Sequence, residues 1–333
     1  MAGSYRVWTI SDPGKNGTLQ LESRQSVALG PADVRIRVHA AGLNRADILQ
    51  RKGLYPAPPG APADIPGLEY AGVVEAVGER VTQRRVGDRV MGLVGGGAYA
   101  EQVVVSERET IRIPDSLSDV EAAATAEAFL TAYRAIFLVG GLERGQWCLI
   151  RAATSGIGLA AMQLCRHFGC HSIGTGRSLE RLQQVRDYGL DVLAVDGDGS
   201  LPELVREHTG DGAQVVLDLV GGGHLQDNLD SLRTEGTHVL VGIMAGPKDS
   251  INLAPVLFRR LNLRAMTMRS LPLERRIAMA RLFEERLTEG FVSGTLRPVV
   301  DSTLPFDKAP EAQALMESGK HAGKIVLAMN ETD

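Results

Sequence analysis

The stretch that decides the fold runs from Trp147 to Phe168 and reads WCLIRAATSGIGLAAMQLCRHF. Its first six residues form a short apolar run of the strand type. After them, apolar residues recur at roughly helical spacing, at Leu159, Met162 and Leu164. The stretch therefore predicts a strand, a tight turn and an amphipathic helix.

The turn itself is a near relative of the glycine-rich dinucleotide fingerprint, with Ala153 and Ser155 in the first two glycine positions and Gly158 in the last. Small residues let the backbone approach a pyrophosphate, which free N–H groups at a helix N-terminus can bind. Any tight turn of this kind in a parallel sheet also favours small residues, so the neighbouring units must decide. The residues predicted to bind a cofactor here are Thr154, Ser155, Gly156, Ile157 and Gly158.

The next predicted strand, His171–Thr175, leads into Gly176, Arg177 and Ser178. A carboxylate at this position would bind the ribose 2′-hydroxyl of NAD, whereas a cation accommodates the 2′-phosphate of NADP. No Asp or Glu occupies it, so Gly176, Arg177 and Ser178 favour NADPH. Arg181, one helical turn further on, fits the same role and fits a solvated helix face equally well.

Composition excludes several classes of function. The 333 residues carry a net charge of −4, with 36 basic and 40 acidic residues interspersed, so no basic patch favours nucleic acid or a membrane surface. No apolar run is long enough to span a bilayer, and the first residues show no apolar export signal. We therefore expect a cytoplasmic protein, and the length predicts two domains.

The cysteines are Cys148, Cys165 and Cys170, and all lie in or beside the fingerprint unit. They form no CxxC pair, and no cluster of histidines accompanies them. This pattern predicts reduced, buried thiols rather than disulfides or a zinc site, which needs four closely spaced ligands. We expect no metal.

Residues 1 to about 120 are rich in predicted strands and suggest a partly open antiparallel barrel. The exceptions are a short helical segment after Ala41, ending at Gly53, and a loop that is too rich in proline for regular structure. Helical spacing then runs from Val120 to Leu138. The strands in this part are predicted at Arg6–Ile10, Leu19–Glu22, Val34–Ala40, 65–78 and after Gly87.

Beyond the fingerprint, strands that are apolar on both faces alternate with helices, which is typical of a doubly wound parallel sheet. Its ligands bind at the carboxyl ends of the strands. Strands are predicted at Val192–Val195, Val215–Leu219 and His238–Val241, and helices at Glu180–Tyr188, Leu201–His208 and His224–Leu232. After Leu263 the alternation stops. Helices at Leu273–Gly290 and Lys308–Ser318 and a strand at 323–327 follow, and we expect this tail to return to the first domain. The predicted domains are 1–123 plus 263–333, with 124–262 inserted.

With these pieces in place, the chain resembles the medium-chain dehydrogenase/reductase superfamily, and within it the zinc-free quinone oxidoreductases of the zeta-crystallin type, including the tumour-suppressor-inducible enzymes of animals. The similarity covers essentially the whole chain. Seven segments carry it in order: 42–55, 66–72, 87–90, 127–133, 155–158, 218–222 and 323–327. The resemblance implies a Rossmann nucleotide domain inserted in a GroES-like catalytic domain.

The resemblance also implies NADPH-dependent reduction of quinones or related conjugated carbonyls by a homodimer that pairs through the last strand of the nucleotide domain, Asn262–Thr267. Zinc alcohol dehydrogenases of the superfamily carry a catalytic cysteine near position 44, where this chain has Asn44. That difference agrees with a metal-free reaction.

By resemblance, Asn44 and Tyr55 are the candidate hydrogen-bond donors for the substrate oxygen, and Thr131 helps to position the nicotinamide ring. Gly242, Ile243 and Met244 are expected to wall the nicotinamide pocket. Asn44 could instead cap the following helix, and Tyr55 could be a half-buried ring at a loop edge. Lys324 matches a family motif without an assigned role, so the default expectation is a surface strand residue.

Two positions depart from the family pattern. Family members often have a tyrosine near the position of Asp196, where it packs on the adenosine phosphate region; the aspartate of this chain removes that donor and is expected to repel the cofactor. Arg45 stands where related enoyl reductases often have a tyrosine proton donor, which counts against acyl-thioester reduction. Two alternatives to a quinone reductase stay open: a reductase of enone or enoyl double bonds, and an NADPH-binding sensor or structural protein with little turnover.

Overall fold

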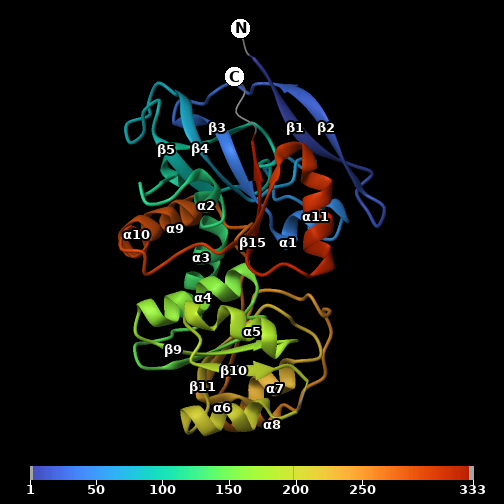
Figure 1. The fold of residues 1–333 in the computed structure, drawn as a ribbon, viewed down its shortest axis with the longest axis vertical. Coiled ribbons are helices and arrows are strands. Elements are labelled where there is room, and N and C mark those ends of the chain that lie inside the picture. Colours follow the sequence, from blue (N-terminus) through green and yellow to red (C-terminus); the bar gives the residue numbers. More distant parts are fainter. Residues whose placement is uncertain (1–2, 198, 330–333) are drawn as a thin grey trace. The chain divides into compact units, whose positions relative to one another are not determined.

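The computed structural model describes residues 3–197 and 199–329 (Figure 1). The chain divides into two compact units, Met1–Glu127 with Arg269–Asp333 (unit 1) and Ala128–Met268 (unit 2). These divisions lie a few residues beyond the predicted boundaries at 123/124 and 262/263. One reason is that the strand Asn262–Ala265 pairs with the sheet of unit 2, so a boundary at 262 would cut it away from that sheet.

In the described part of unit 2, six strands form one parallel sheet in the order β10-β9-β8-β11-β12-β13. The order reverses between β8 and β11, the switch point at which a doubly wound sheet binds its ligand. The strands are β8 Trp147–Ile150, β9 His171–Gly176, β10 Val192–Val195, β11 Ala213–Asp218, β12 Leu232–Leu240 and β13 Asn262–Ala265. The predicted α/β class with a doubly wound sheet is confirmed.

The helices of unit 2 connect these strands (Figure 1). They are the end of α3 (Ala126–Tyr133), the π-helix Arg134–Val139, α4 Gly156–His167, α5 Leu179–Val185 with the 3-10 turn Arg186–Tyr188, α6 Leu201–Thr209, α7 Leu225–Asp230 and α8 Ala254–Phe258. A buried apolar cluster that includes Leu149, Ile173, Val216 and Leu229 joins strands and helices into one core. Strand β12 begins six residues before the predicted His238 because its first part is polar and partly exposed, which hides it from the hydrophobic pattern.

Unit 1 is built on a seven-stranded sheet within the described residues, in which β14-β15-β3-β4-β5-β7 are neighbours and β6 also pairs with β3. These strands are β3 Asp33–Gly42, β4 Glu69–Val77, β5 Arg89–Leu93, β6 Gln102–Ser106, β7 Ile111–Arg112, β14 Val300–Pro305 and β15 Lys324–Ala328. A separate hairpin pairs β1 Ser4–Ser11 with β2 Thr18–Gln25. Because β15 pairs antiparallel with β3, the C-terminal tail completes the N-terminal sheet.

The helices of unit 1 are α1 Arg45–Arg51, α2 Asp119–Ala123, α9 Leu273–Arg286, α10 Thr288–Val292 and α11 Ala309–Ser318, with 3-10 turns at Glu107–Glu109 and Phe306–Lys308. The single helix predicted at Leu273–Gly290 is broken at Leu287. This break lets the buried rings of Phe283 and Phe291 stack with their centroids 5.4 Å apart.

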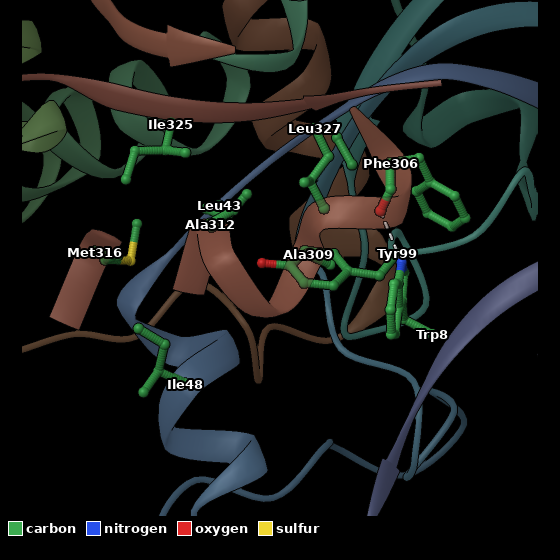
Figure 2. Close-up of a cluster of buried hydrophobic side chains, with 11 residues drawn as sticks. Trp8, Leu43, Ile48, Tyr99, Phe306, Ala309, Ala312, Met316, Ile325 and Leu327 are labelled. Carbon is green, nitrogen blue, oxygen red and sulfur yellow. Dashed lines mark hydrogen bonds between the residues drawn. The ribbon is translucent and has the colours of Figure 1, made fainter. Parts of the chain in front are cut away.

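Figure 2 shows the buried cluster that ties the two ends of the chain together in unit 1. Trp8 of β1 donates its indole N–H to the carbonyl of Phe306 at 2.9 Å. Ile48 of α1 belongs to the same cluster as Met316 of α11 and Ile325 of β15. Burying side chains from sequence-distant segments together fixes the position of α1. It therefore also fixes Asn44, which directly precedes this helix.

Candidate functional site

The turn between β8 and α4 has the geometry that a dinucleotide fingerprint requires. Ser155 is the N-cap of α4, and its Oγ accepts a hydrogen bond from the N–H of Gly158 at 3.1 Å. A Cβ atom on Gly158 would lie 2.6 Å from the carbonyl oxygens of both Ala152 and Ala153, so only glycine fits. Thr154 precedes the N-cap, and Gly156 and Ile157 are the first residues of α4. Its backbone can therefore come close to an anion at the helix N-terminus.

A pocket of about 270 Å³ lies beside this turn, lined by Thr154, Arg177, Ser178 and Arg181. The structure thus brings together residues that are 27 positions apart in the chain, as the sequence predicted for a phosphate site. Ser178 is the N-cap of α5 and accepts the N–H of Arg181 at 3.4 Å, which leaves its hydroxyl hydrogen for another acceptor. None of these described lining residues is acidic.

Arg177 is exposed, and neither a hydrogen bond nor an ion pair of its guanidinium is found within residues 3–197 and 199–329. A guanidinium that presents its N–H donors to solvent beside a helix N-terminus suits bidentate binding of a phosphate group. Gly176, which is buried at the end of β9, places Arg177 there. These features fit the adenosine phosphate end of an NAD(P)-type cofactor.

Arg151 is a charged residue that sequence reasoning missed. It follows β8 and is only 1% exposed, and its Nη2 lies 3.3 Å from a carboxylate oxygen of Asp196 and 2.6 Å from Nδ1 of His224. The carboxylate of Asp196 therefore has a counter-charge that the sequence analysis did not foresee, which weakens the expected repulsion of the cofactor. The signal in the sequence was an arginine directly after an apolar strand.

Asp218 ends β11 and shapes the loop at the switch point. Its Oδ1 accepts the N–H groups of Val220 and Gly221 at 2.8 and 2.9 Å, and its Oδ2 accepts from His238 at 2.9 Å. Burial alone would raise the pKa of Asp218, but the hydrogen bonds from His238 and the two backbone N–H groups outweigh it and lower the pKa. Asp218 is thus an ionised residue that holds the loop by hydrogen bonds, rather than a proton donor.

Gly242, Ile243 and Met244 follow β12 at the same edge of the sheet. The N–H of Gly242 donates to the carbonyl of Asp218 at 3.2 Å, which sets this segment beside the end of β11. The side chains of Ile243 and Met244 are 51% and 62% exposed, so they present apolar surface at the carboxyl edge. Thr131 lies on α3 and is 2% exposed. The geometry thus keeps Gly242, Ile243 and Met244 next to the switch point.

Asn44 sits between β3 and α1 in unit 1, at the N-cap position of the helix. Its backbone N–H donates to the carboxylate of Asp47 at 2.8 Å, so the capping role weighed for Asn44 is present. Its side chain does something else: Oδ1 accepts from Nζ of Lys324 at 2.7 Å, and Nδ2 donates to Glu69 at 3.0 Å. Asn44 therefore joins a buried network of charges.

Lys324 is 5% exposed, so the default expectation of a surface strand residue was wrong. The reason is that β15 lies inside the sheet between β14 and β3, and the side chain of its first residue reaches the loop before α1. Sequence patterning could not reveal this, because an isolated lysine at a strand end is usually exposed.

Asp47 is buried beneath the same loop, where it accepts hydrogen bonds from the N–H of Gly67 at 3.2 Å and from the hydroxyl of Tyr99 at 3.2 Å. Burial raises the pKa of Asp47 to about 6, although the N–H of Asn44 and the charge of Lys324 favour its ionised form. Because its pKa is 3.8 in the unfolded chain and about 6 in the folded protein, the carboxyl group is ionised in the unfolded chain and protonated in the folded protein at pH values between these two.

This raised pKa predicts a pH-dependent stability. The folded protein binds the Asp47 proton more tightly than the unfolded chain, so the stabilisation is complete below pH 3.8 and is lost as the pH rises through about 6. Between pH 8 and pH 5 the free energy of unfolding of the wild type should rise by about 1 kcal/mol relative to Asp47→Asn. Denaturant unfolding of both proteins at the two pH values measures this, and a constant difference would contradict it.

Tyr55 lies four residues after the end of α1, near the start of the loop that leads to β4, and is half-buried. Arg269, which sequence reasoning missed, holds it: the guanidinium donates to the carbonyl of Tyr55 at 2.7 Å and lies over its ring, 5.1 Å from the centroid. Arg269 is 4% exposed and also donates to Gly95 and Gln50. The ring is thus anchored at its backbone and its face, which places its hydroxyl on a restrained loop.

The cysteines are all buried; a hydrogen bond with Cys148 and burial raise the pKa of Cys165, and burial with the proximity of Cys148 raises the pKa of Cys170. Among the described residues, no group of three or more His, Cys, Asp or Glu side chains is placed to hold a metal ion. Among the same residues, no helix has both the length and the apolarity needed to cross a membrane.

Comparison with known proteins agrees with this architecture. Residues 30–115 match the family described as "Alcohol dehydrogenase GroES-like domain", and residues 156–285 match the one described as "Zinc-binding dehydrogenase". The human "Synaptic vesicle membrane protein VAT-1 homolog" is 31% identical over 97% of this chain and 86% of its own length. The "Quinone oxidoreductase" of Lama guanicoe is 30% identical over 97% of this chain and of its own length.

The structure of mycobacterial Rv1454c complexed with NADPH superposes with a TM-score of 0.86 at 27% identity, covering 97% of this chain and 99% of the other. An inserted unit with a doubly wound parallel sheet, a GroES-like unit and relatives of this similarity over nearly the full length lead to one assignment. The chain belongs to the medium-chain dehydrogenase/reductase superfamily of oxidoreductases, and quinone oxidoreductases are among its relatives.

Proposed function

We propose that the protein is a metal-free reductase that transfers hydride from NADPH to quinones. The observation that carries this proposal is the pocket lined by Thr154, Arg177, Ser178 and Arg181, in which two guanidinium groups and a hydroxyl stand where an NAD-selective site would hold a carboxylate. Relatives named quinone oxidoreductase, and one neighbour complexed with NADPH, support the substrate and the cofactor.

The reaction needs little acid–base chemistry from the protein. When bound, NADPH would supply an electron pair as hydride, and a quinone that takes up this hydride and one proton from solvent becomes a hydroquinone. Negative charge develops on a quinone oxygen, and the reduced oxygens are weak bases. The protein must therefore orient the two reactants and offer a neutral hydrogen-bond donor, whereas a strong general acid is unnecessary.

On the substrate side we assign two residues of unit 1. The hydroxyl of Tyr55 is a donor on a loop that Arg269 restrains. Asn44 is half-buried, and its carboxamide cannot titrate, so it serves as a neutral donor held in one orientation. In unit 2, Thr131 would help to position the nicotinamide ring, and Gly242, Ile243 and Met244 would wall its pocket through backbone contacts.

The test is oxidation of NADPH and of NADH by the purified protein with a small ortho-quinone, a para-quinone and a simple enone. We expect fast, NADPH-dependent turnover with at least one quinone. Turnover confined to the enone would replace this proposal with a double-bond reductase. Tight binding of NADPH without turnover of any of the three would replace it with a cofactor-binding sensor or structural protein.

We also propose that the protein is a homodimer that pairs through β13. This strand is an edge of the six-stranded sheet, with β12 its neighbour, and its backbone is open to a second strand. Apolar side chains gather on it and on the preceding α8: Leu257 and Phe258 are 71% and 76% exposed, and Leu263 is 46% exposed. A second copy of the same edge would cover both features with one two-fold contact.

Replacing both Leu257 and Phe258 with Glu should convert the dimer to a monomer, because it would bury like charges against each other in the proposed contact. Sedimentation or light scattering at micromolar concentration measures the mass. The matched control is Val86→Glu, an apolar side chain of unit 1 that is 61% exposed and lies outside the proposed contact. A wild-type monomer, or an unchanged mass in the double variant, would contradict the proposed interface.

A further inference from the structure

The strongest unexplained feature of the molecule is the buried lysine of unit 1. Nζ of Lys324 donates to the carbonyl of Leu43 and to Oδ1 of Asn44, both at 2.7 Å, and forms an ion pair with Glu69. Lys324 is 5% exposed and Glu69 is 0% exposed. All three N–H donors of the ammonium group therefore have partners. Removing two charges from water at one loop costs desolvation free energy, which their mutual attraction can fail to offset. The arrangement therefore points to a role beyond stability.

The rest of the network is built around the same carboxamide. One carboxylate oxygen of Glu69 accepts from Nδ2 of Asn44 at 3.0 Å, and the other accepts the backbone N–H of Glu127 at 2.9 Å. Gly42 leaves room for this contact, because a side chain there would collide with the carboxylate of Glu69. Three segments of unit 1 that are far apart in the chain thus converge on Asn44.

These contacts determine which way the carboxamide faces. An ammonium group can only donate, so it binds the oxygen of Asn44, and a carboxylate can only accept, so it binds the NH2 group. A flipped amide would set Nδ2 against Lys324 and Oδ1 against Glu69, losing both bonds. The second N–H of Nδ2 has one acceptor in the structure, the carbonyl of Gly42 at 3.3 Å, which is a long contact.

We propose that Lys324 is a positioning residue for the reductase reaction: it locks the carboxamide of Asn44 so that one N–H stays on Glu69 and the other, held only by the long contact to Gly42, is the one offered to the substrate oxygen. The proposal rests on the proposed function. A cation on Oδ1 also draws electron density from the amide, which makes the remaining N–H a stronger donor to an oxygen that gains negative charge. Lys324 acts through Asn44 and exchanges no proton with the substrate.

The experiment is a double-mutant cycle that separates positioning from stability. Lys324→Met removes the ammonium group but leaves the charge of Glu69 buried, so the variant Lys324→Met with Glu69→Gln, which removes both charges together, is made as well. Asn44→Ala is combined with each. The readouts are kcat and KM with the quinone, the Kd of NADPH and the thermal midpoint. The control is Lys308→Met, whose exposed side chain pairs with Glu311.

We expect Lys324→Met to lower kcat about 10-fold, with and without Glu69→Gln, while the Kd of NADPH changes less than 2-fold. In the Asn44→Ala background the same substitution should change kcat less than 2-fold, because the group through which it acts is gone. An equal loss of kcat in both backgrounds would overturn the proposal. So would full recovery of kcat by Glu69→Gln, since that would show that only the unpaired charge was harmful.

A second readout does not depend on which substrate is reduced. With selective ¹⁵N labelling of asparagine, the side-chain NH2 resonances of Asn44, identified by their loss in Asn44→Ala, should move and exchange faster with water in Lys324→Met, but not in Lys308→Met. An unmoved, slowly exchanging resonance would overturn the inference. If instead the wild type reduces no quinone while the resonance moves as expected, the proposed function fails and the orientation by Lys324 stands.

Discussion

Arg177→Ala should weaken the binding of NADPH by about 10- to 100-fold and change the binding of NADH less than 3-fold. A charge-assisted hydrogen bond contributes roughly 1.5–3 kcal/mol, and only NADPH carries the phosphate that receives it. Arg177 is suited to this because it lines the pocket beside Ser178 while exposing its guanidinium. Titration of each cofactor by fluorescence or calorimetry gives the two dissociation constants.

Ionic strength and a matched variant complete this test. The loss should shrink at high salt, since an exposed charge pair is screened. Arg186→Ala removes an exposed arginine just beyond α5, which is outside the residues lining the pocket, and should change neither dissociation constant. Equal weakening of NADPH and NADH by Arg177→Ala would remove the basis for assigning the 2′-phosphate to this pocket.

The second large effect is expected at the fingerprint turn. Gly158→Ala would set a methyl group 2.6 Å from two carbonyl oxygens and 2.7 Å from Cα of Ala153, and no flexible side chain is there to move aside. Overpacking against backbone should lower the free energy of unfolding by about 2 kcal/mol. Because the same backbone forms the proposed anion site, the affinity for NADPH should fall at least 10-fold, and the affinity for NADH should fall by the same factor.

Gly14→Ala is the matched control for this steric argument. A Cβ atom on Gly14 would lie 3.9 Å from the nearest atom, the carbonyl oxygen of Asp12, so the substitution should cost almost nothing. Thermal unfolding and cofactor titration of both variants decide the matter. A Gly158→Ala protein with wild-type stability and affinity would mean that the turn does not approach the cofactor closely.

The cofactor half of the site could be predicted because its determinants are local. A strand, a tight turn and a capped helix follow one another within Trp147–Phe168, and Arg177 and Ser178, which we propose to select NADPH, directly follow the next strand. Parallel strands place their carboxyl ends at one edge, so a periodic pattern is enough to bring these residues together. The pocket lining agrees with that reasoning.

The substrate half could not be predicted in the same way. Lys324 meets Asn44 from 280 positions away, and Arg269 meets Tyr55 from 214 positions away. Both side chains are buried because distant strands and loops cover them, and neither hydrophobic periodicity nor a motif encodes that contact. The pair of Arg151 and Asp196 escaped for the same reason, since the two residues follow different strands of the sheet.

Buried arginines and lysines are therefore where sequence reasoning was weakest and where the structure adds most. Three of them contact polar groups of distant residues: Lys324 binds Asn44, Arg269 binds the carbonyl of Tyr55, and Arg151 lies beside Asp196. Such pairs do little for net stability. Their common effect is to fix polar groups in one orientation.

The most direct test of the central claim is a single-turnover reaction without oxygen. Protein dialysed against a chelator is loaded with one equivalent of NADPH and mixed with a quinone in a stopped-flow instrument. We predict rapid loss of the absorbance of NADPH, with one hydroquinone formed for each NADPH oxidised and no gain from added zinc. Bound NADPH that stays reduced in the presence of quinone, or a reaction that starts only when zinc is restored, would contradict a metal-free quinone reductase.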